Sequence, residues 1–126
     1  MKLFFHERIK ARKDFKNSVF LKCTEPFLTK GKSSKIIEIG CGGGWNLDVF
    51  KRAGYTNLVG YEPGTINRNL GIRELGLNLR EGFIDDVCES GEKYDLIILH
   101  HVIEHLIDPI NVLKKLKNLL TDEGVL

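Results

Sequence analysis

The sequence predicts an α/β fold, a doubly wound parallel sheet with helices on both faces. From residue 36 onward, short apolar runs alternate with helical stretches, which is the pattern of βαβ units. Glycine or Glu-Pro-Gly closes the first two runs, as turn residues do at the ends of strands. The 126 residues are 42% hydrophobic and 29% charged, a globular composition that suffices for one modest domain.

We divide the chain at residue 35. Residues 1–35 predict a basic N-terminal helical extension that ends in the polar link TKGKSSK. The apolar residues that its helix brings to one side are Phe5, Ile9, Val19 and Phe20. Residues 36–126 carry the strand and helix alternation and form the second part.

Within residues 36–126 the elements follow from apolar patterning and caps. The expected strands are 36–39, 58–61, 77–79 and 94–99. Two expected helices, 45–53 and 65–75, are closed by Gly54 and Gly76. Asp108-Pro109 opens a third helix, with aspartate as the cap and proline in the first turn. The apolar stripe of that helix is Ile110, Leu113, Leu116 and Leu120.

The last strand is expected to have barely begun. Thr121 to Gly124 read as a turn into Val125-Leu126. A sheet that stops there is incomplete at its C-terminal strands, so we expect the N-terminal part of a longer protein. An open parallel edge could pair with a second copy and give a dimer.

Charge is unevenly distributed. Residues 1–35 hold ten Lys and Arg against three Asp and Glu, although the whole chain has a net charge of only +2. Such an arm could attract nucleic acid, but an amphipathic helix with a solvated lysine face is the preferred interpretation. Its central basic residues are Lys10, Arg12, Lys13 and Lys16.

We expect a cytoplasmic protein with no membrane segment. No apolar run approaches the roughly 18 residues of a membrane helix, and the N-terminus lacks the features of a signal peptide. The three cysteines, Cys23, Cys41 and Cys88, are widely spaced and odd in number, which argues against a disulfide framework.

A glycine-rich loop follows the first strand, in the string Glu38-Ile-Gly-Cys-Gly-Gly-Gly44. Its position between a strand and a helix favours close approach of backbone to a ligand. The dinucleotide fingerprint would demand a glycine at Trp45, and a phosphate-binding P-loop would need Gly-Lys-Ser/Thr. Both phosphate-binding interpretations therefore lose a key residue.

The remaining pattern, E-x-G-x-G-x-G, resembles motif I of the class I S-adenosylmethionine-dependent methyltransferases, which share a Rossmann-like sheet. In that family the loop wraps the amino-acid and ribose part of the cofactor, and the acid lies beside the methionine moiety. The resemblance implies cofactor contacts from Glu38, Gly40, Cys41, Gly42 and Gly44.

The resemblance continues at the ends of the second and third strands. Glu62, followed by Pro63, stands where the family places an acid that accepts hydrogen bonds from both ribose hydroxyls. A carboxylate suits a vicinal diol because it has two acceptor oxygens. Phe83 and Ile84 stand where relatives line the adenine. Two carboxylates could meet the adenine amine, Asp85 and Asp86.

A second string, HHVIEHLIDP after the fourth strand, is similar to the small-molecule and ubiquinone-pathway branch of the same family. There the first residue after the strand, here His100, approaches the methionine portion of the cofactor. His100 or His101 could serve as a general base if the acceptor must lose a proton. We treat both as hypotheses for catalysis.

The same string also matches H-x-x-E-H, the pattern of the inverted zinc peptidases, at His101, Glu104 and His105. That reading needs a continuous helix and a third protein ligand, and the sequence offers no clear candidate. We expect no metal, and we expect Glu104 and His105 to brace the loop. Cys41 is expected to pack in the loop and not to act as a nucleophile.

The resemblance implies methyl transfer from S-adenosylmethionine to an unidentified acceptor, preferably a small molecule, leaving S-adenosylhomocysteine. The methyl group is already activated by the sulfonium, so proximity and orientation can supply most of the acceleration. The alternative is a non-catalytic S-adenosylmethionine-binding module that acts through a partner or RNA.

Overall fold

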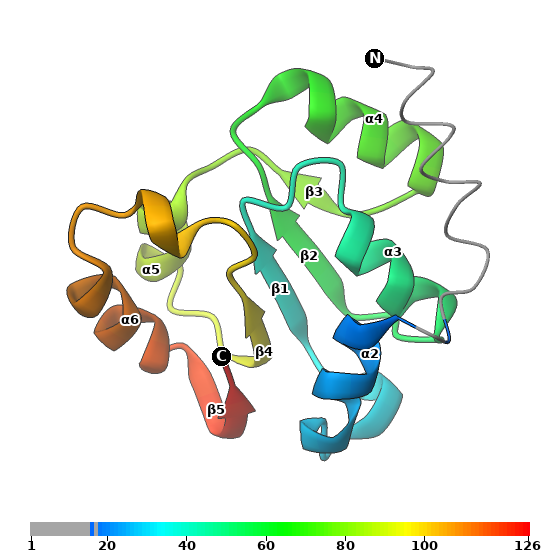
Figure 1. The fold of residues 1–126 in the computed structure, drawn as a ribbon, viewed down its shortest axis with the longest axis horizontal. Helices are drawn as coiled ribbons and strands as arrows, with labels where there is room; N and C mark the ends of the chain where they lie inside the picture. Colours follow the sequence, from blue (N-terminus) through cyan, green and yellow to red (C-terminus); the bar gives the residue numbers. More distant parts are fainter. Residues whose placement is uncertain (1–15, 17) are drawn as a thin grey trace.

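A parallel sheet of five strands forms the centre of the protein (Figure 1). The structure is a computed structural model that describes residue 16 and residues 18–126. The strands run in the order β3-β2-β1-β4-β5, and each neighbouring pair is parallel. They are β1 (Ile36–Ile39), β2 (Leu58–Tyr61), β3 (Leu79–Arg80), β4 (Tyr94–Ile98) and β5 (Leu120–Val125). The predicted doubly wound fold is confirmed.

Helices cover both faces of the sheet (Figure 1). The α-helices are α2 (Val19–Thr24), α3 (Trp45–Arg52), α4 (Thr65–Leu75), α5 (Ile84–Glu89) and α6 (Pro109–Lys117). Three short 3-10 turns are η2 (Glu25–Phe27), η3 (Gly31–Ser33) and η4 (Ile103–His105). Helices α2, α3 and α4 pack on one face, and α5 and α6 pack on the other.

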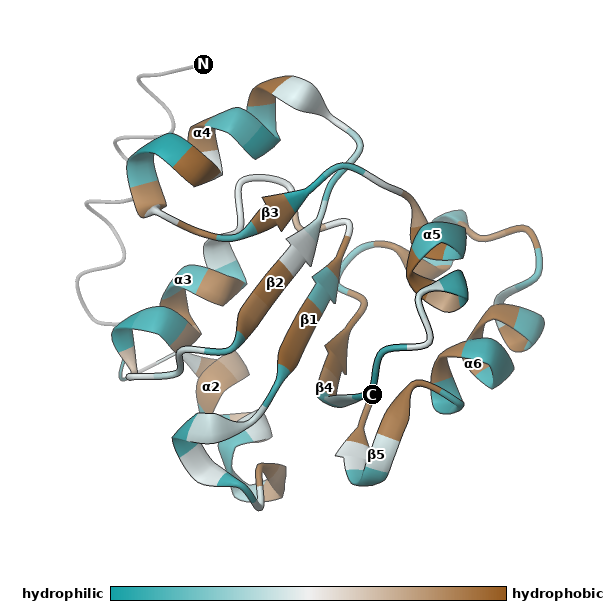
Figure 2. Cartoon of the chain, turned by 180° about the vertical axis from the view of Figure 1, so that it is seen from behind, coloured by the Kyte–Doolittle hydropathy of each residue, from teal (hydrophilic) through white to brown (hydrophobic). Residues whose placement is uncertain are grey.

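The buried residues accordingly form two hydrophobic clusters with the sheet between them. Phe50 of α3 belongs to the first cluster, and Val87 of α5 belongs to the second. Strand β1 supplies both, because Ile36 faces the first cluster and Ile37 the second. The mostly hydrophobic strands in Figure 2 reflect this burial on both faces, which is typical of parallel sheets.

Strand β5 differs from the prediction. Residues 121–124 are part of the strand and not a turn before it. The two ends of β5 pair with Tyr94 and Leu96, so six residues of β5 stand against three of β4. The Thr121 hydroxyl donates to Oδ1 of Asp95 at 2.8 Å, which holds the irregular stretch against the sheet. A long-range contact of this kind leaves no periodic signal in the sequence.

Helix α6 begins as predicted, but only part of the predicted apolar stripe is buried. The Asp108 carboxylate accepts a hydrogen bond from the backbone N–H three residues later at 3.1 Å. Of the predicted stripe, Ile110 is 67% exposed, whereas Leu116 is fully buried. In this region the second cluster contains Leu116 and Leu119, with Val112 and Leu120 packed against it. Leu116 and Leu120 of the predicted stripe therefore do face the core, although Leu120 belongs to β5 and not to the helix.

The region after β2 contains a shorter strand and an additional helix. Strand β3 has only two residues. Leu77, which was expected in this strand, is buried in the first cluster but precedes the strand. Helix α5 was not predicted. Its first turn is capped because the Asp86 carboxylate accepts a hydrogen bond from the backbone N–H of Phe83 at 2.6 Å.

The described part of the N-terminal extension packs against the sheet domain. Leu21 and Leu28 are buried in the first cluster, and the Phe20 ring meets Phe50 edge-on at 6.4 Å between centroids. Val19, expected on the same side, is exposed, and that expectation was wrong. The other residues named for the helix or the basic arm lie outside the described residues: Phe5, Ile9, Lys10, Arg12 and Lys13.

Asp95 joins the extension to the sheet at the amino ends of β1 and β4. Its carboxylate accepts hydrogen bonds from Lys30 Nζ at 2.6 Å and from the backbone N–H of Lys35 at 2.8 Å. The backbone carbonyl of Lys35 in turn accepts from both Asp95 and Leu96, at 2.8 Å and 3.2 Å. Asp95 is buried, and with the Thr121 bond its carboxylate has three donors.

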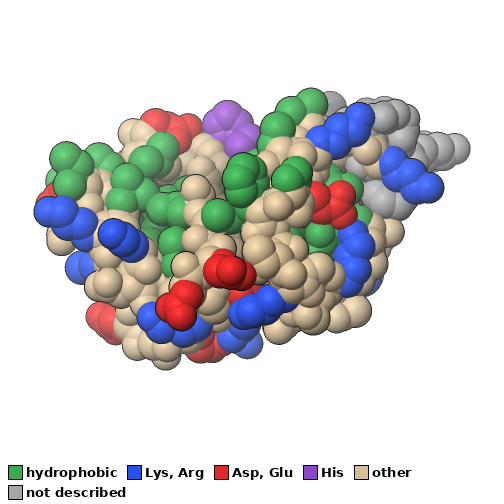
Figure 3. All heavy atoms as spheres, turned by 90° about the horizontal axis from the view of Figure 1, so that it is seen from below, with side chains coloured by type: hydrophobic (Ala, Val, Ile, Leu, Met, Phe, Trp, Pro, Cys, Tyr) green, Lys and Arg blue, Asp and Glu red, His purple; other side chains and the backbone are tan. Residues whose placement is uncertain are grey.

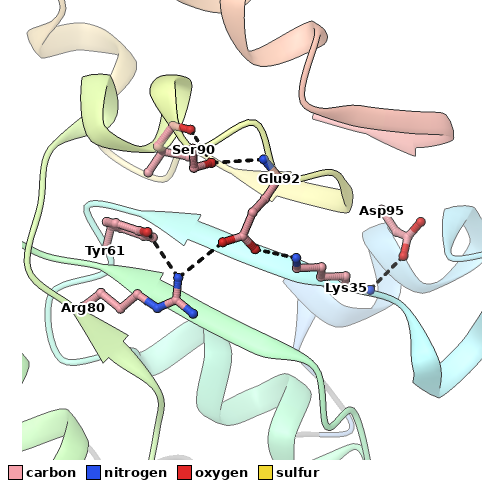
Figure 4. A network of polar contacts seen from close by, with 7 residues as sticks. Lys35, Tyr61, Arg80, Ser90, Glu92 and Asp95 are labelled. Atoms are coloured by element: carbon pink, nitrogen blue, oxygen red, sulfur yellow. Dashed lines mark hydrogen bonds and ion pairs between the residues drawn. The ribbon is translucent and has the colours of Figure 1, made fainter.

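A second polar network lies around the loop before β4 (Figure 4). Lys35 Nζ and Arg80 Nη1 lie 2.5 Å and 3.5 Å from the two carboxylate oxygens of Glu92. Arg80 also donates to the Tyr61 hydroxyl at 3.4 Å. The hydrogen bond from Lys35 lowers the pKa of Glu92. These contacts fasten the short strand β3 to the segment that leads into β4.

On the face shown in Figure 3, acidic and basic side chains are interspersed and no single-sign patch dominates. Within residue 16 and residues 18–126, no helix combines the length and the apolar character needed to cross a membrane.

Candidate functional site

The candidate site lies at the carboxyl ends of the strands, where the order of the sheet reverses. Strands β2 and β3 follow β1 on one side, whereas β4 and β5 lie on the other. The loops after β1 and β4 therefore leave the sheet in opposite directions and open a crevice between them. Ligands of doubly wound sheets bind in such crevices.

The loop after β1 has the backbone geometry that its glycines allow. Gly40, Gly42 and Gly44 all have positive φ, at 69°, 55° and 77°. A Cβ on Gly40 would lie 2.6 Å from Val102 Cγ2, so the loops after β1 and β4 approach each other too closely for a side chain. The predicted glycine loop thus presents bare backbone to the crevice.

Glu62, at the end of β2, holds this loop. Its Oε2 accepts a hydrogen bond from the backbone N–H of Gly42 at 2.8 Å, and its Oε1 accepts one from Gly64 at 2.6 Å. Each carboxylate oxygen has a second lone pair, so the group can still accept from a ligand. The carboxylate is half-buried beside the glycine loop.

An apolar cavity of about 210 Å³ is lined by Pro63, the residue after Glu62, whereas Glu62 itself does not line it. The predicted residues Gly40, Pro63, Phe83 and Ile84 all line it, although they come from three different strand ends. Phe83 is 66% exposed, unusual for a large aromatic side chain outside a contact surface. The remaining lining residues are Ile39, Gly82, His101, Val102, His105 and Leu106.

Neither of the two candidate carboxylates after β3 lines the cavity. Asp86 caps α5, as described above. Asp85 is exposed and lies 4.0 Å from Lys115 Nζ on α6. The residues that close this end of the cavity are apolar, so a flat apolar ligand group is better suited to it than a charged one.

A polar chain lies on the other side of the glycine loop. Glu38 is buried, and its Oε1 accepts a hydrogen bond from Asn46 Nδ2 at 2.7 Å. The same amide nitrogen lies 3.4 Å from His100 Nδ1. The Phe20 ring covers His100 edge-on at 5.8 Å. Two predicted residues are therefore linked by Asn46, which the sequence analysis did not single out because its position in α3 shows no distinctive pattern.

The two adjacent histidines have different surroundings. His101 lines the cavity, whereas His100 points to Asn46 and lies outside the lining. Their rings are 4.1 Å apart between centroids. His101 has a φ of 59°, the left-handed conformation that side chains other than glycine rarely adopt. Such strain often occurs at functional positions.

The H-x-x-E-H string does not form a zinc-peptidase helix. His101 precedes a single 3-10 turn, η4, and its Nδ1 lies 3.4 Å from the Glu104 carboxylate. The helix on which such a motif must present two histidines is therefore missing. Across residue 16 and residues 18–126, no three His, Cys, Asp or Glu side chains are grouped to hold a metal ion.

Cys41 has the packing role that the sequence predicted. It is buried in the first cluster, and its Sγ would lie 2.6 Å from a Cβ placed on Gly60 of β2. Burial, reinforced by the nearby charges of Glu38 and Glu62, raises the pKa of the thiol. A thiol with a raised pKa is a poor nucleophile at neutral pH.

Comparison with known families now bears on this geometry. Residues 6–126 match the family model described as a methyltransferase domain. The chain is 34% identical over 107 residues to a tRNA U34 carboxymethyltransferase of Campylobacter hominis, covering 79% of this chain and 36% of that protein. It is 32% identical over 111 residues to a ubiquinone biosynthesis O-methyltransferase of Dinoroseobacter shibae, covering 84% and 43%.

Solved structures agree in fold. The plantazolicin methyltransferase BpumL, in complex with an analogue and SAH, superposes with a TM-score of 0.67 at 21% identity over 92% of this chain and 49% of that one. PKMT2 from Rickettsia typhi with AdoHcy gives 0.66 at 22% identity over 87% and 24%. The chain spans 36% and 43% of the two curated relatives named above. With the family match extending over nearly all of its residues, the chain is a member of the class I S-adenosylmethionine-dependent methyltransferase family.

Proposed function

We propose that this chain is the cofactor-binding part of an S-adenosylmethionine-dependent methyltransferase. The observation that carries the proposal is the position of Glu62: its carboxylate accepts a hydrogen bond from the glycine-loop backbone, and the next residue, Pro63, lines an apolar cavity. A carboxylate that can accept hydrogen bonds from ribose hydroxyls, close to an apolar cavity that can take a base, suits the two parts of a nucleoside. In this proposal residues 36–126 bind the cofactor, and residues 1–35 are the N-terminal extension and linker.

The residues fit the cofactor group by group. The cavity formed by Pro63, Phe83 and Ile84 would take the adenine, because an apolar slot suits a planar heterocycle. The Glu62 carboxylate would accept from the ribose hydroxyls. The backbone of Gly40–Gly44 and the buried Glu38 would hold the amino-acid portion. S-adenosylmethionine supplies, when bound, a methyl group activated by a positively charged sulfur.

The contribution of this chain to the transfer would be placement. Glycine-loop backbone and Glu62 fix the cofactor in one orientation, and orientation alone can supply much of the acceleration. His101 lines the cavity and could accept a proton from the acceptor. His100 has its Nδ1 directed to the Asn46 amide, so in its neutral form Nε2 carries the proton and can donate but not accept.

For the acceptor we favour a small molecule. The ubiquinone biosynthesis relatives are named as O-methyltransferases, and the tRNA relative as a carboxymethyltransferase, so two acceptor classes occur among proteins of similar sequence. Several of the relatives are ubiquinone biosynthesis O-methyltransferases, and this supports a small-molecule acceptor. This choice is part of the proposal.

Calorimetric titration of the 126-residue chain with S-adenosylmethionine and S-adenosylhomocysteine tests the proposal. A hydrogen bond to a charged group contributes about 1.5–3 kcal/mol, so Glu62→Gln should weaken binding roughly tenfold to a hundredfold. Glu123→Gln, an exposed carboxylate on β5, is the matched control and should bind like the wild type. A folded wild-type chain that binds neither compound would contradict the proposal.

A further inference from the structure

Arg68 of α4 is a buried cation that does not line the cavity. Its side chain is only 9% exposed. Nη1 donates to the backbone carbonyl of Glu62 at 2.7 Å and to that of Pro63 at 3.1 Å. Nη2 donates to the Glu81 carboxylate at 3.0 Å. One guanidinium thus joins the loop after β2 to the loop after β3.

The carbonyl contacts are the more important part of this arrangement. Glu81 is 73% exposed, and an ion pair with so exposed a partner contributes little in water. The two carbonyls belong to the residues that present the diol-binding carboxylate and one wall of the cavity. A guanidinium can reach both from one nitrogen while bonding a third group, since its donors form a rigid planar fork.

Helix α4 also contacts the glycine loop. A Cβ placed on Gly71 would lie 2.5 Å from the backbone carbonyl oxygen of Gly43. Gly71 lies three residues after Arg68 and therefore on the same side of the helix. One helix face thus rests against the loops after β1, β2 and β3, all of which contribute to the candidate site.

We propose that Arg68 is a positioning residue that holds the loop after β2 in the conformation in which Glu62 can receive the cofactor ribose. The inference rests on the proposed function and deepens it. Arg68 does not line the cavity, so it acts through the backbone of Glu62 and of Pro63, the latter of which does line it. Without the guanidinium, the Glu62 carboxylate is still present, but it is no longer held in position to accept the hydrogen bond from Gly42.

The test measures S-adenosylhomocysteine affinity in variants of the 126-residue chain. Arg68→Met should weaken binding roughly tenfold, which corresponds to about one lost hydrogen bond at the ligand. Arg68→Lys keeps the positive charge but lacks the planar fork, so its affinity for S-adenosylhomocysteine should lie between those of Arg68→Met and the wild type. Arg73→Met is the matched control, because Arg73 lies on the same helix and, among the described residues, its exposed side chain bonds the neighbouring Glu74. Glu81→Gln should bind within about twofold of the wild type.

A double-mutant cycle with Glu62→Gln separates positioning from general support of the fold. If Arg68 acts through the carboxylate, Arg68→Met should cost clearly less affinity in the Glu62→Gln background than in the wild type. A merely structural role would lower affinity equally in both backgrounds, and that result would overturn the inference. Equal affinities of Arg68→Met and Arg73→Met would overturn it as well. Arg68→Lys takes the place of Arg68→Met in the cycle if the methionine variant does not fold.

The two proposals fail in different ways. A folded wild-type chain without affinity for S-adenosylhomocysteine contradicts the proposed function. The other outcome is that the wild type binds, that Glu62→Gln weakens binding, and that the double-mutant cycle shows no coupling between Glu62 and Arg68. This outcome leaves the proposed function intact and contradicts only the role of Arg68.

Discussion

Asp95→Asn should cost stability without altering the cofactor site. The substitution removes a buried charge that accepts from Lys30, Thr121 and the backbone N–H of Lys35. Oδ1 accepts from Lys30 and Thr121 and Oδ2 from Lys35, so an amide loses one or two of the three bonds according to its orientation, and the bonds that remain no longer involve a charged acceptor. At about 1.5–3 kcal/mol for each bond to a charged group, and with incomplete additivity, unfolding should become easier by about 2–4 kcal/mol.

Urea denaturation of wild type and variant measures this cost. The control is Lys30→Met, which removes only a lysine side chain that is 53% exposed and should cost no more than about 1 kcal/mol. Equal losses in the two variants would refute the reasoning, because the buried hydroxyl and N–H bonds would then contribute nothing. Asp95 lies at the amino ends of the strands, so the folded fraction should bind S-adenosylhomocysteine normally.

The stability difference between the wild type and Asp95→Asn should depend on pH. Burial alone would raise the pKa of Asp95, but the hydrogen bonds from Lys30, Lys35 and Thr121 outweigh it and the pKa is lowered. The unfolded value is about 3.9, so this stabilisation is complete above about pH 4 and is lost as the pH falls through the lower folded value. Wild type and Asp95→Asn should converge in acid. A difference that stays constant from pH 7 to pH 3 would contradict the assignment.

Three further expectations concern the loop and its surroundings. Gly44→Ala places a Cβ 2.5 Å from Leu77 Cδ1 at a φ of 77° and should lower stability by about 1–3 kcal/mol, and an unchanged thermal midpoint would argue against this packing. In the folded chain at pH 8, iodoacetamide should label the exposed Cys23 and spare the buried Cys41, whose pKa is raised, and mass spectrometry of the peptides decides this. Asn46→Leu removes an amide donor to a buried carboxylate and should cost about 1–3 kcal/mol in denaturation, more than a leucine placed at an exposed position of the same helix.

The parts of the site that the sequence could predict are those with local backbone causes. Gly40, Gly42 and Gly44 indicate a loop that needs left-handed residues, and the structure has all three at positive φ. Glu62 and Pro63 end an apolar run and so had to lie at the same edge of the sheet as the glycine loop. Because parallel strands end together, strand order alone brings these residues to one crevice.

The parts that could not be predicted depend on contacts distant in sequence. Asn46 and Arg68 are ordinary polar residues within helices, and only the folded chain shows what they touch. In strand β5 the polar residue Thr121 bonds to Asp95 of β4, a contact that no hydrophobic pattern records. Helix α5 was missed because its apolar face is short, with Val87 as its only fully buried residue.

Strand β1 supplies residues to both hydrophobic clusters, and this has a consequence for how the chain unfolds. Ile36 and Ile37 are adjacent in sequence, yet each completes the core on a different side of the sheet. If the helices on one face detached, β1 would lose its packing on that side, and the helices on the other face pack against the same strand. The two layers should open as one cooperative unit, so the β1 amides should exchange with solvent only through global unfolding, whereas the loop tips at the strand ends can open locally. Ligands would thus contact the strand ends, which can open locally, while the centre of the sheet stays folded.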